Sequence, residues 1–97
     1  MIDVREYCDG QGRSPFGRWF NRLKVEPAAW VLTVITRIEE DANFGDSKSV
    51  GRGVSELRIN KGPGYRVYYG MDGEKMVILG ARTIHGIHGI DGISLDL

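Results

Sequence analysis

Between residues 55 and 79 the chain has three short strand-like runs, with a turn sequence after each of the first two, and the first two runs alternate apolar and polar side chains. The runs cover residues 55–59, 65–71 and 75–79, and the turns are Gly62-Pro63-Gly64 and Asp72-Gly73. A period of two is that of a strand with one buried face, and Asp-Gly favours a two-residue hairpin turn. The sequence therefore predicts a three-strand antiparallel meander.

The apolar residues of the first two runs constrain how these strands pair. A slip of one residue would turn Arg66 toward the core, so only registers that align Leu57 and Ile59 with Val67 are tolerable. Each of these registers places four polar side chains together on the opposite face: Glu56, Arg58, Arg66 and Tyr68. With Asp72-Gly73 as the turn, Tyr68 is expected opposite Val77 and Arg66 beside Leu79.

The N-terminal half has the pattern of one strand and two helices. Residues 2–7 alternate as a strand does, and Ser14-Pro15 is typical of a helix start. Four apolar residues follow at helical spacing, namely Phe16, Trp19, Phe20 and Leu23. Pro27 opens a second helix by the same logic, and residues 43–53 are expected to form a polar connection. The predicted fold is α+β, in the order β-α-α-β-β-β, with an N-terminal strand and a two-helix hairpin packed on a mostly antiparallel sheet.

Composition limits the class of protein. The 97 residues suit one domain, and 41% hydrophobic and 27% charged residues are ordinary for a folded chain. The longest apolar run, residues 76–79, is too short to span a bilayer, and the N-terminus lacks the pattern of a secretory signal. We therefore expect a cytoplasmic protein with no membrane partner. Cys8 is the single cysteine, which excludes an internal disulfide and a thiolate metal cage.

Charge is balanced over the whole chain but not along it. Thirteen basic and thirteen acidic residues cancel, whereas residues 46–66 hold five basic residues against two acidic ones. The basic residues are Lys48, Arg52, Arg58, Lys61 and Arg66, and the acidic ones are Asp46 and Glu56. One interpretation is an ordinary solvated sheet face. The other is a phosphate-binding site.

The second interpretation has a definite chemistry. When RNA is cleaved without a metal, fixed cations must stabilise the charge that develops at phosphorus, and nearby groups must move two protons. Arginine suits the first task through its planar, permanently charged guanidinium group, and lysine, tyrosine or histidine suits the second. His85, His88 and Asp91 have a spacing that metal ligands can have, but polar residues of a tail are the favoured interpretation, and we assign no metal and no cofactor.

Three segments resemble the RelE/ParE toxin superfamily, and within it the HigB-like addiction-module killer proteins of phage-derived type. These segments run from Arg5-Glu6-Tyr7 to Phe16, from Lys48 through Glu56-Leu57-Arg58-Ile59, and from Gly62 through Gly64-Tyr65-Arg66-Val67-Tyr68. The resemblance implies a toxin domain over residues 1–80. Residues 81–97 depart from the family pattern as a Gly/His-rich tail, where Arg82 is a candidate to replace a lysine that relatives carry.

The resemblance also implies a function. Members of the family are toxins of type II toxin–antitoxin modules that cleave mRNA on the ribosome without metal and are neutralised by a cognate antitoxin protein. It implies catalytic roles for Arg58, Arg66 and Lys48, to which we add Tyr68 and Arg82. Four further basic residues are expected to bind RNA: Arg52, Lys61, Arg18 and Arg22. Two alternatives stay open, a ParE-like inhibitor of DNA gyrase and a catalytically inactive homologue that binds antitoxin; a homo-oligomer or a toxin–antitoxin hetero-oligomer is compatible with each.

Overall fold

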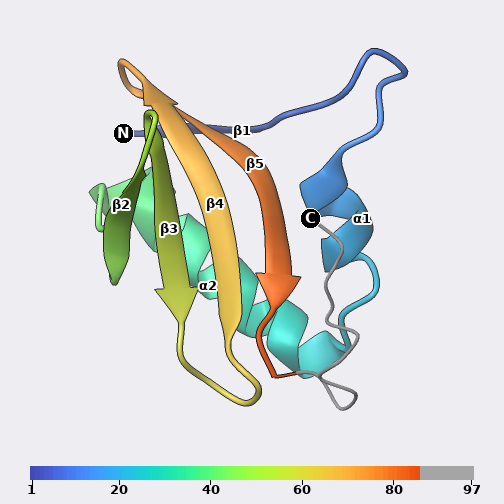
Figure 1. Cartoon of the computed structure of the whole chain (residues 1–97). Coiled ribbons are helices and arrows are strands. Elements are labelled where there is room, and N and C mark those ends of the chain that lie inside the picture. The colour runs from blue at the N-terminus through green and yellow to red at the C-terminus, as the bar shows by residue number, and fades with distance from the viewer. Residues whose placement is uncertain (86–97) are drawn as a thin grey trace.

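The computed structural model describes residues 1–85, which form one sheet and two helices (Figure 1). Along the chain the elements are β1 (Asp3–Glu6), α1 (Pro15–Phe20), α2 (Val25–Asp41), β2 (Ser47–Gly51), β3 (Val54–Ile59), β4 (Tyr65–Asp72) and β5 (Lys75–Thr83). The strand order across the sheet is β1-β5-β4-β3-β2, with β1 parallel to β5 and every other pair antiparallel. The fold is therefore α+β with a mixed five-strand sheet.

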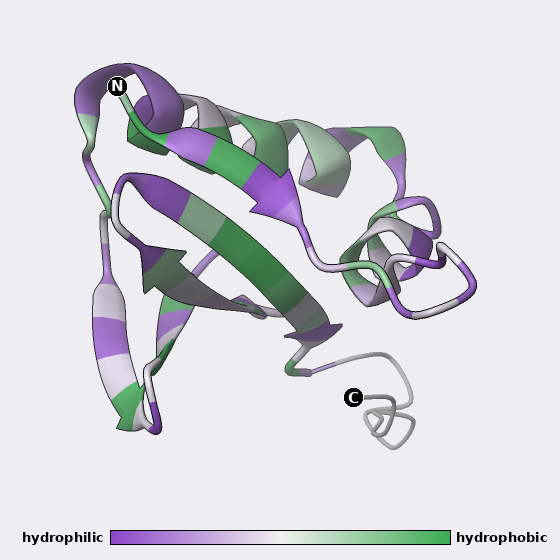
Figure 2. Ribbon diagram, turned by 90° about the horizontal axis from the view of Figure 1, so that it is seen from above, coloured by the Kyte–Doolittle hydropathy of each residue, from purple (hydrophilic) through white to green (hydrophobic). Residues whose placement is uncertain are grey.

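The core lies between the sheet and the helices. Helix α2 runs along one side of the sheet, and no helix of residues 1–85 covers the other side (Figures 1 and 2). The buried residues come from both helices and from β3, β4 and β5: Phe16, Val31, Ile35, Ile38, Leu57, Ile59, Tyr65, Val67, Tyr69, Met76, Ile78 and Ala81. The alternation of Leu57 and Ile59 with Glu56 and Arg58 thus predicted the buried face of β3 correctly.

Residues 43–53 are not only a polar connection, because they include the edge strand β2. Ser47 pairs with Leu57 and Lys48 with Glu56. All residues of β2 except Ser47 are exposed, so the strand carries no apolar alternation that the sequence could display. Its backbone pairing with β3, rather than side-chain burial, holds it in the sheet.

Each helix differs from the predicted one at a single end: α1 ends earlier and α2 begins earlier. Ser14 caps α1 as predicted, since its Oγ accepts a hydrogen bond from the Gly17 N–H at 2.9 Å. This helix ends at Phe20, so Leu23 packs against the core from beyond it. Helix α2 begins at Val25 rather than at Pro27, because a proline is tolerated in the first turn, where its missing N–H breaks no helical hydrogen bond.

The turn between β4 and β5 is Gly73-Glu74, not Asp72-Gly73. Asp72 pairs with Lys75 and Met71 with Met76, so Gly73 takes the first central position of the turn with a φ of 63°. A positive φ there suits glycine, which has no Cβ to clash. The predicted partners of Tyr68 and Arg66 on β5 are therefore wrong, as described below.

Strand β5 continues past residue 79, where the predicted strand ends, and ends at Thr83. Beyond it, the Ile84 N–H donates to the Gly64 carbonyl at 2.9 Å, and the His85 N–H donates to the Pro63 carbonyl at 3.0 Å. The chain is thus hydrogen-bonded to the turn between β3 and β4 as far as residue 85. Neither helix described in residues 1–85 is long and apolar enough to cross a membrane.

Candidate functional site

Three arginines lie side by side across three neighbouring strands. Arg58 on β3 pairs with Arg66 on β4, and Arg66 pairs in turn with Arg82 on β5. Residues directly opposite each other in a sheet project from the same face. Leu57 and Val67, which alternate with the arginines, are buried on the helix side, so the three guanidinium groups belong to the opposite face. We call this surface the arginine face.

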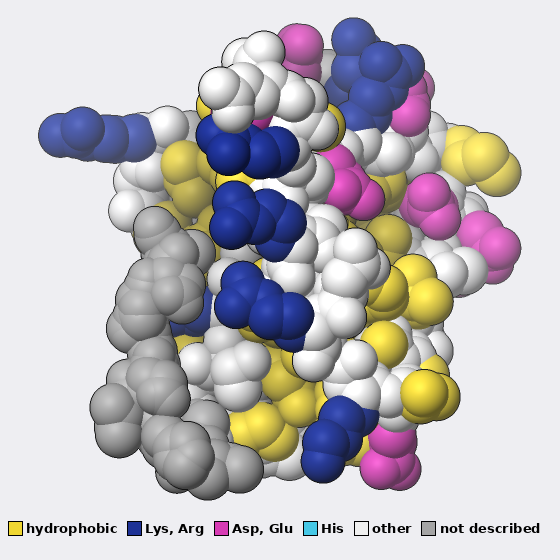
Figure 3. Space-filling view, turned by 90° about the vertical axis from the view of Figure 1, so that its right-hand side faces the viewer, with side chains coloured by type: hydrophobic (Ala, Val, Ile, Leu, Met, Phe, Trp, Pro, Cys, Tyr) yellow, Lys and Arg dark blue, Asp and Glu magenta, His cyan; other side chains and the backbone are white. Residues whose placement is uncertain are grey.

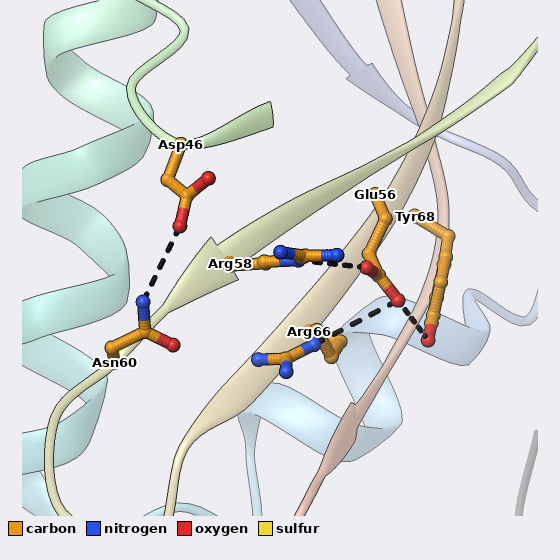
Figure 4. A network of polar contacts seen from close by, with 6 residues as sticks. All are labelled: Asp46, Glu56, Arg58, Asn60, Arg66 and Tyr68. Carbon is orange, nitrogen blue, oxygen red and sulfur yellow. Dashed lines mark hydrogen bonds and ion pairs between the residues drawn. The ribbon is translucent and has the colours of Figure 1, made fainter. Parts of the chain in front are cut away.

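The carboxylate of Glu56 is the centre of this face (Figure 4). Its Oε1 accepts a hydrogen bond from Arg58 Nε at 3.0 Å, and its Oε2 accepts one from the Tyr68 hydroxyl at 3.1 Å. Arg66 Nε lies 3.7 Å from the same Oε2 as an ion pair. One carboxylate therefore contacts all three of the polar side chains that the alternation placed together.

The cluster is partly withdrawn from water. The side chain of Glu56 is 13% exposed, that of Arg66 22% and that of Arg58 33%. Burial raises the pKa of the Glu56 carboxyl, but hydrogen bonds from Arg58 and Tyr68 and the positive charges of both arginines outweigh it, so the pKa lies below its usual value. Glu56 is consequently ionised at neutral pH, and a carboxylate with a lowered pKa is a weak base there.

Arg82 reaches the arginine face because of a β-bulge. Tyr69 pairs with Ile78 and Tyr68 with Gly80, so Leu79 is an extra residue on β5. Without the bulge, Arg82 would follow Met76, Ile78 and Gly80 on the core side. The bulge changes the alternation, so that Ala81 is buried and Arg82 is exposed opposite Arg66. Arg82 forms no ion pair with any of residues 1–85, whereas Arg58 and Arg66 both pair with Glu56.

Lys48 joins the same face from the edge strand. In the strand register, Lys48 lies opposite Glu56, and Glu56 lies opposite Tyr68. These three residues therefore form a second row beside the arginines. The sequence placed Lys48 in a loop, and the structure places it on β2, where it is exposed. Its ammonium group is therefore a further positive charge at the rim of the cluster.

Two of the expected RNA-binding residues lie apart from this cluster. The Lys61 ammonium lies over the ring of Trp30, 5.3 Å from its centroid, and is therefore held against α2. Arg52 is exposed in the turn between β2 and β3, with a φ of 56°. Neither residue makes an ion pair within the part of the chain that the structure describes.

Arg18 and Arg22 belong to a separate basic surface on and around α1. No acidic residue occurs from 11 to 24, and a column of Lys and Arg side chains runs down the side of the molecule that carries α1 (Figure 3). Arg22 Nε donates to the Arg18 backbone carbonyl at 3.3 Å, which holds the Arg22 side chain against the last turn of α1. Arg13 also lies in this segment but is paired with Asp9 at 3.0 Å.

Sequence reasoning placed Glu56 on the right face but missed its central contacts. Two local signals point to the arrangement: Glu56 is the single acidic residue of β3 and stands two positions before Arg58, and Gly80 within a strand is a common sign of a bulge. Among residues 1–85 no group of three or more His, Cys, Asp or Glu side chains could hold a metal ion. His85 is exposed, and the candidates His88 and Asp91 lie outside the described residues.

The chain is similar in sequence to a protein whose own function is not described. An uncharacterized protein of Haemophilus influenzae is 41% identical over 64 residues, which cover 66% of this chain. The match spans 65% of that relative, slightly less than two thirds of its length. No known protein family matches the chain, and no solved structure matches it.

Proposed function

We propose that this protein is a RelE-like, HigB-type toxin of a type II toxin–antitoxin module, and that it cleaves mRNA on the ribosome without a metal ion. The observation that carries the proposal is the row Arg58–Arg66–Arg82 on the open face of the sheet, with Tyr68 and Lys48 beside it. The α+β element order, with two helices between the first strand and the antiparallel strands, supports the RelE-like assignment.

The arrangement suits the cleavage of RNA by its own 2′-hydroxyl. The 2′-oxygen attacks phosphorus, the bond from phosphorus to the 5′-oxygen breaks, and the products are a 2′,3′-cyclic phosphate and a 5′-hydroxyl. One proton leaves the 2′-oxygen and one reaches the 5′-oxygen, so no metal is needed if two groups exchange protons with the substrate. Arg58, Arg66 and Arg82 stabilise the charge on the phosphoryl oxygens. Of Lys48 and Tyr68, one accepts the proton of the 2′-hydroxyl in its deprotonated form, and the other donates a proton to the leaving 5′-oxygen.

The two basic surfaces have different roles in this proposal. The arginine face binds the scissile phosphate. Arg18 and Arg22, with the other cations around α1, contact phosphates of the ribosome or of the flanking message. Lys61 and Arg52 bind RNA phosphates at the ends of the strands, outside the arginine cluster.

The deciding experiment is to induce the protein in bacteria and to map new 5′ ends of mRNA, with Arg66→Ala as the test variant. Loss of one transition-state contact should lower the cleavage rate by about two to three orders of magnitude. Growth inhibition should disappear with it. Cleavage by wild-type protein and purified translating ribosomes should be resistant to selective removal of contaminating transition metals.

Arg37→Ala is the matched control, because Arg37 is an exposed arginine on α2, on the other side of the sheet. It should leave growth inhibition and cleavage unchanged. The thermal melting of Arg66→Ala should stay near that of the wild type, since an exposed or partly exposed ion pair contributes about 1 kcal/mol or less.

Other outcomes identify the rival functions. DNA breaks with intact mRNA would indicate a gyrase inhibitor. Neither kind of damage, with tight binding to an antitoxin, would indicate an inactive homologue. If wild-type protein leaves mRNA intact in the presence of translating ribosomes, the nuclease proposal is wrong.

A further inference from the structure

Both arginines that contact Glu56 do so through the same atom. Arg58 and Arg66 each direct Nε toward the carboxylate, one to Oε1 at 3.0 Å and the other to Oε2 at 3.7 Å. An arginine has five N–H donors, of which four are on the two terminal nitrogens. Within residues 1–85, no hydrogen bond is donated by the terminal nitrogens of Arg58 or Arg66. Glu56 thus holds each guanidinium by its inner edge and leaves the outer edge for a ligand.

The arginines lie opposite one another in the sheet, and their like charges explain why a carboxylate lies between them. Arg58 and Arg66 are directly opposite each other, and Arg82 is directly opposite Arg66 on the other side. Like charges in these positions destabilise a sheet and drive long side chains apart. A single carboxylate between the first two arginines offsets this repulsion and limits the directions in which their flexible side chains can point.

We propose that Glu56 is a positioning residue, which aligns Arg58, Arg66 and Tyr68 for one phosphate group without itself contacting the substrate. This proposal rests on the proposed function, because it assumes that the arginine face binds a phosphodiester. The 13% exposure of the Glu56 side chain agrees with a role behind the arginines rather than on the surface. Its lowered pKa agrees with a permanent counter-ion rather than with a proton acceptor.

The charge and the length of the side chain both matter to this role. A carboxylate has two acceptor oxygens, and here they serve two arginines and a hydroxyl. Glutamine has one acceptor oxygen, and its amide nitrogen donates, so it cannot serve donors on both sides. Glu56→Gln should therefore release at least one arginine, and because it removes a negative charge it raises the net charge of the face by one.

The test distinguishes the alignment of the arginines, which affects kcat, from the electrostatic attraction of RNA, which affects KM. In Glu56→Gln, kcat for ribosome-dependent cleavage should fall about 10- to 100-fold, because misplacement of catalytic groups by about 1 Å has an effect of this size. KM should not rise, because the face is more positive. Glu74→Gln is the matched control, since it makes the same charge change at the exposed turn between β4 and β5 and should alter neither parameter.

A second measurement does not depend on cleavage. The Nε–Hε resonances of Arg58 and Arg66, assigned with Arg58→Lys and Arg66→Lys, should shift and broaden in Glu56→Gln but not in Glu74→Gln. Binding of an RNA oligonucleotide that carries 2′-O-methyl groups, which cannot be cleaved, should be as tight as in the wild type or tighter. If Glu56→Gln does not fold, Glu56→Asp keeps the charge on a shorter side chain and should show the same resonance shifts with a smaller loss of kcat.

Three results would overturn the proposal. The first is a pair of arginine resonances that do not change in either Glu56 variant. The second is faster cleavage by Glu56→Gln, which would mean that Glu56 shields the arginines from the substrate. The third is weaker binding of the methylated oligonucleotide by a folded Glu56→Gln. If the wild type cleaves no mRNA, the proposed function fails, and the resonances and the oligonucleotide binding still decide whether Glu56 aligns an anion site.

Discussion

At the scale of single residues, the arginine face is defined by which groups share a partner. Glu56 is the common partner of Arg58, Arg66 and Tyr68, so the four side chains behave as one unit. Substitutions within such a unit are not additive, because each removal changes the surroundings of the others. The change in unfolding free energy of the double variant Glu56→Gln/Arg66→Ala is therefore expected to differ from the sum of the changes in the two single variants.

Glu56 should also make stability depend on pH. Burial raises the pKa of its carboxyl, but the contacts with Arg58, Tyr68 and Arg66 lower it overall, below the usual 4.5. A carboxyl whose pKa is lower in the folded state stabilises the protein above its unfolded-state pKa, and this contribution is lost as the pH falls through the folded-state pKa. Thermal melts from about pH 7 down to about pH 3 should show wild-type stability falling toward, or below, that of Glu56→Gln. A difference between the two proteins that stays constant with pH would contradict this expectation.

At the scale of elements, α1 depends on its cap more than a longer helix would. It has six residues, and isolated helices of this length do not form in water. Ser14 Oγ accepts from the Gly17 N–H at 2.9 Å and donates to Glu6 Oε1 at 2.6 Å, so one hydroxyl joins the helix to the residue that ends β1. Phe16 and its aromatic neighbours then dock the helix on the core.

Ser14→Ala removes both hydrogen bonds and should destabilise the protein by about 1 kcal/mol. For a domain of this size, that loss should lower the melting temperature by about 4–8 °C. Ser14→Thr keeps the hydroxyl and serves as the control. Equal melting temperatures for Ser14→Ala and the wild type, measured by circular dichroism, would show that the cap does not contribute to stability.

At the scale of the whole molecule, a net charge of zero conceals separated charges. The end of α2 carries Glu39, Glu40 and Asp41, and Glu39 and Glu40 line a surface hollow with Asp3 near the N-terminus. The arginine face and the column along α1 hold the opposite charge. Such a distribution favours a partner with an acidic segment, which under the proposed function is the antitoxin.

Expression together with the protein encoded by the neighbouring gene should therefore yield a stable complex. Because the contact is expected to be electrostatic, dissociation should increase with salt concentration, and Arg58→Ala/Arg66→Ala should weaken the complex further. Affinity purification followed by a salt series measures both effects. Recovery of this protein alone, while its neighbour is expressed and soluble, would count against a toxin–antitoxin pair.

Local pattern by itself determined the faces of the central strands and the start of α1. A strand has a period of two, so burying Leu57, Ile59 and Val67 necessarily places Arg58 and Arg66 on the other side. This inference needs no knowledge of distant residues. The same holds for Ser14-Pro15, because a capping side chain acts within one turn of the chain.

Only the tertiary structure decided which residue of β5 lies beside Arg66, and what joins the polar side chains. A regular ladder through Met76 and Ile78 would turn Arg82 into the core, where an unpaired charge is costly, and the bulge at Leu79 avoids this by burying Ala81 instead. The strand β2, which brings Lys48 to Glu56, is likewise held by backbone pairing that leaves no apolar signature. Periodicity specifies the face of a residue, whereas its neighbours depend on register, and register depends on how the whole sheet packs against the core.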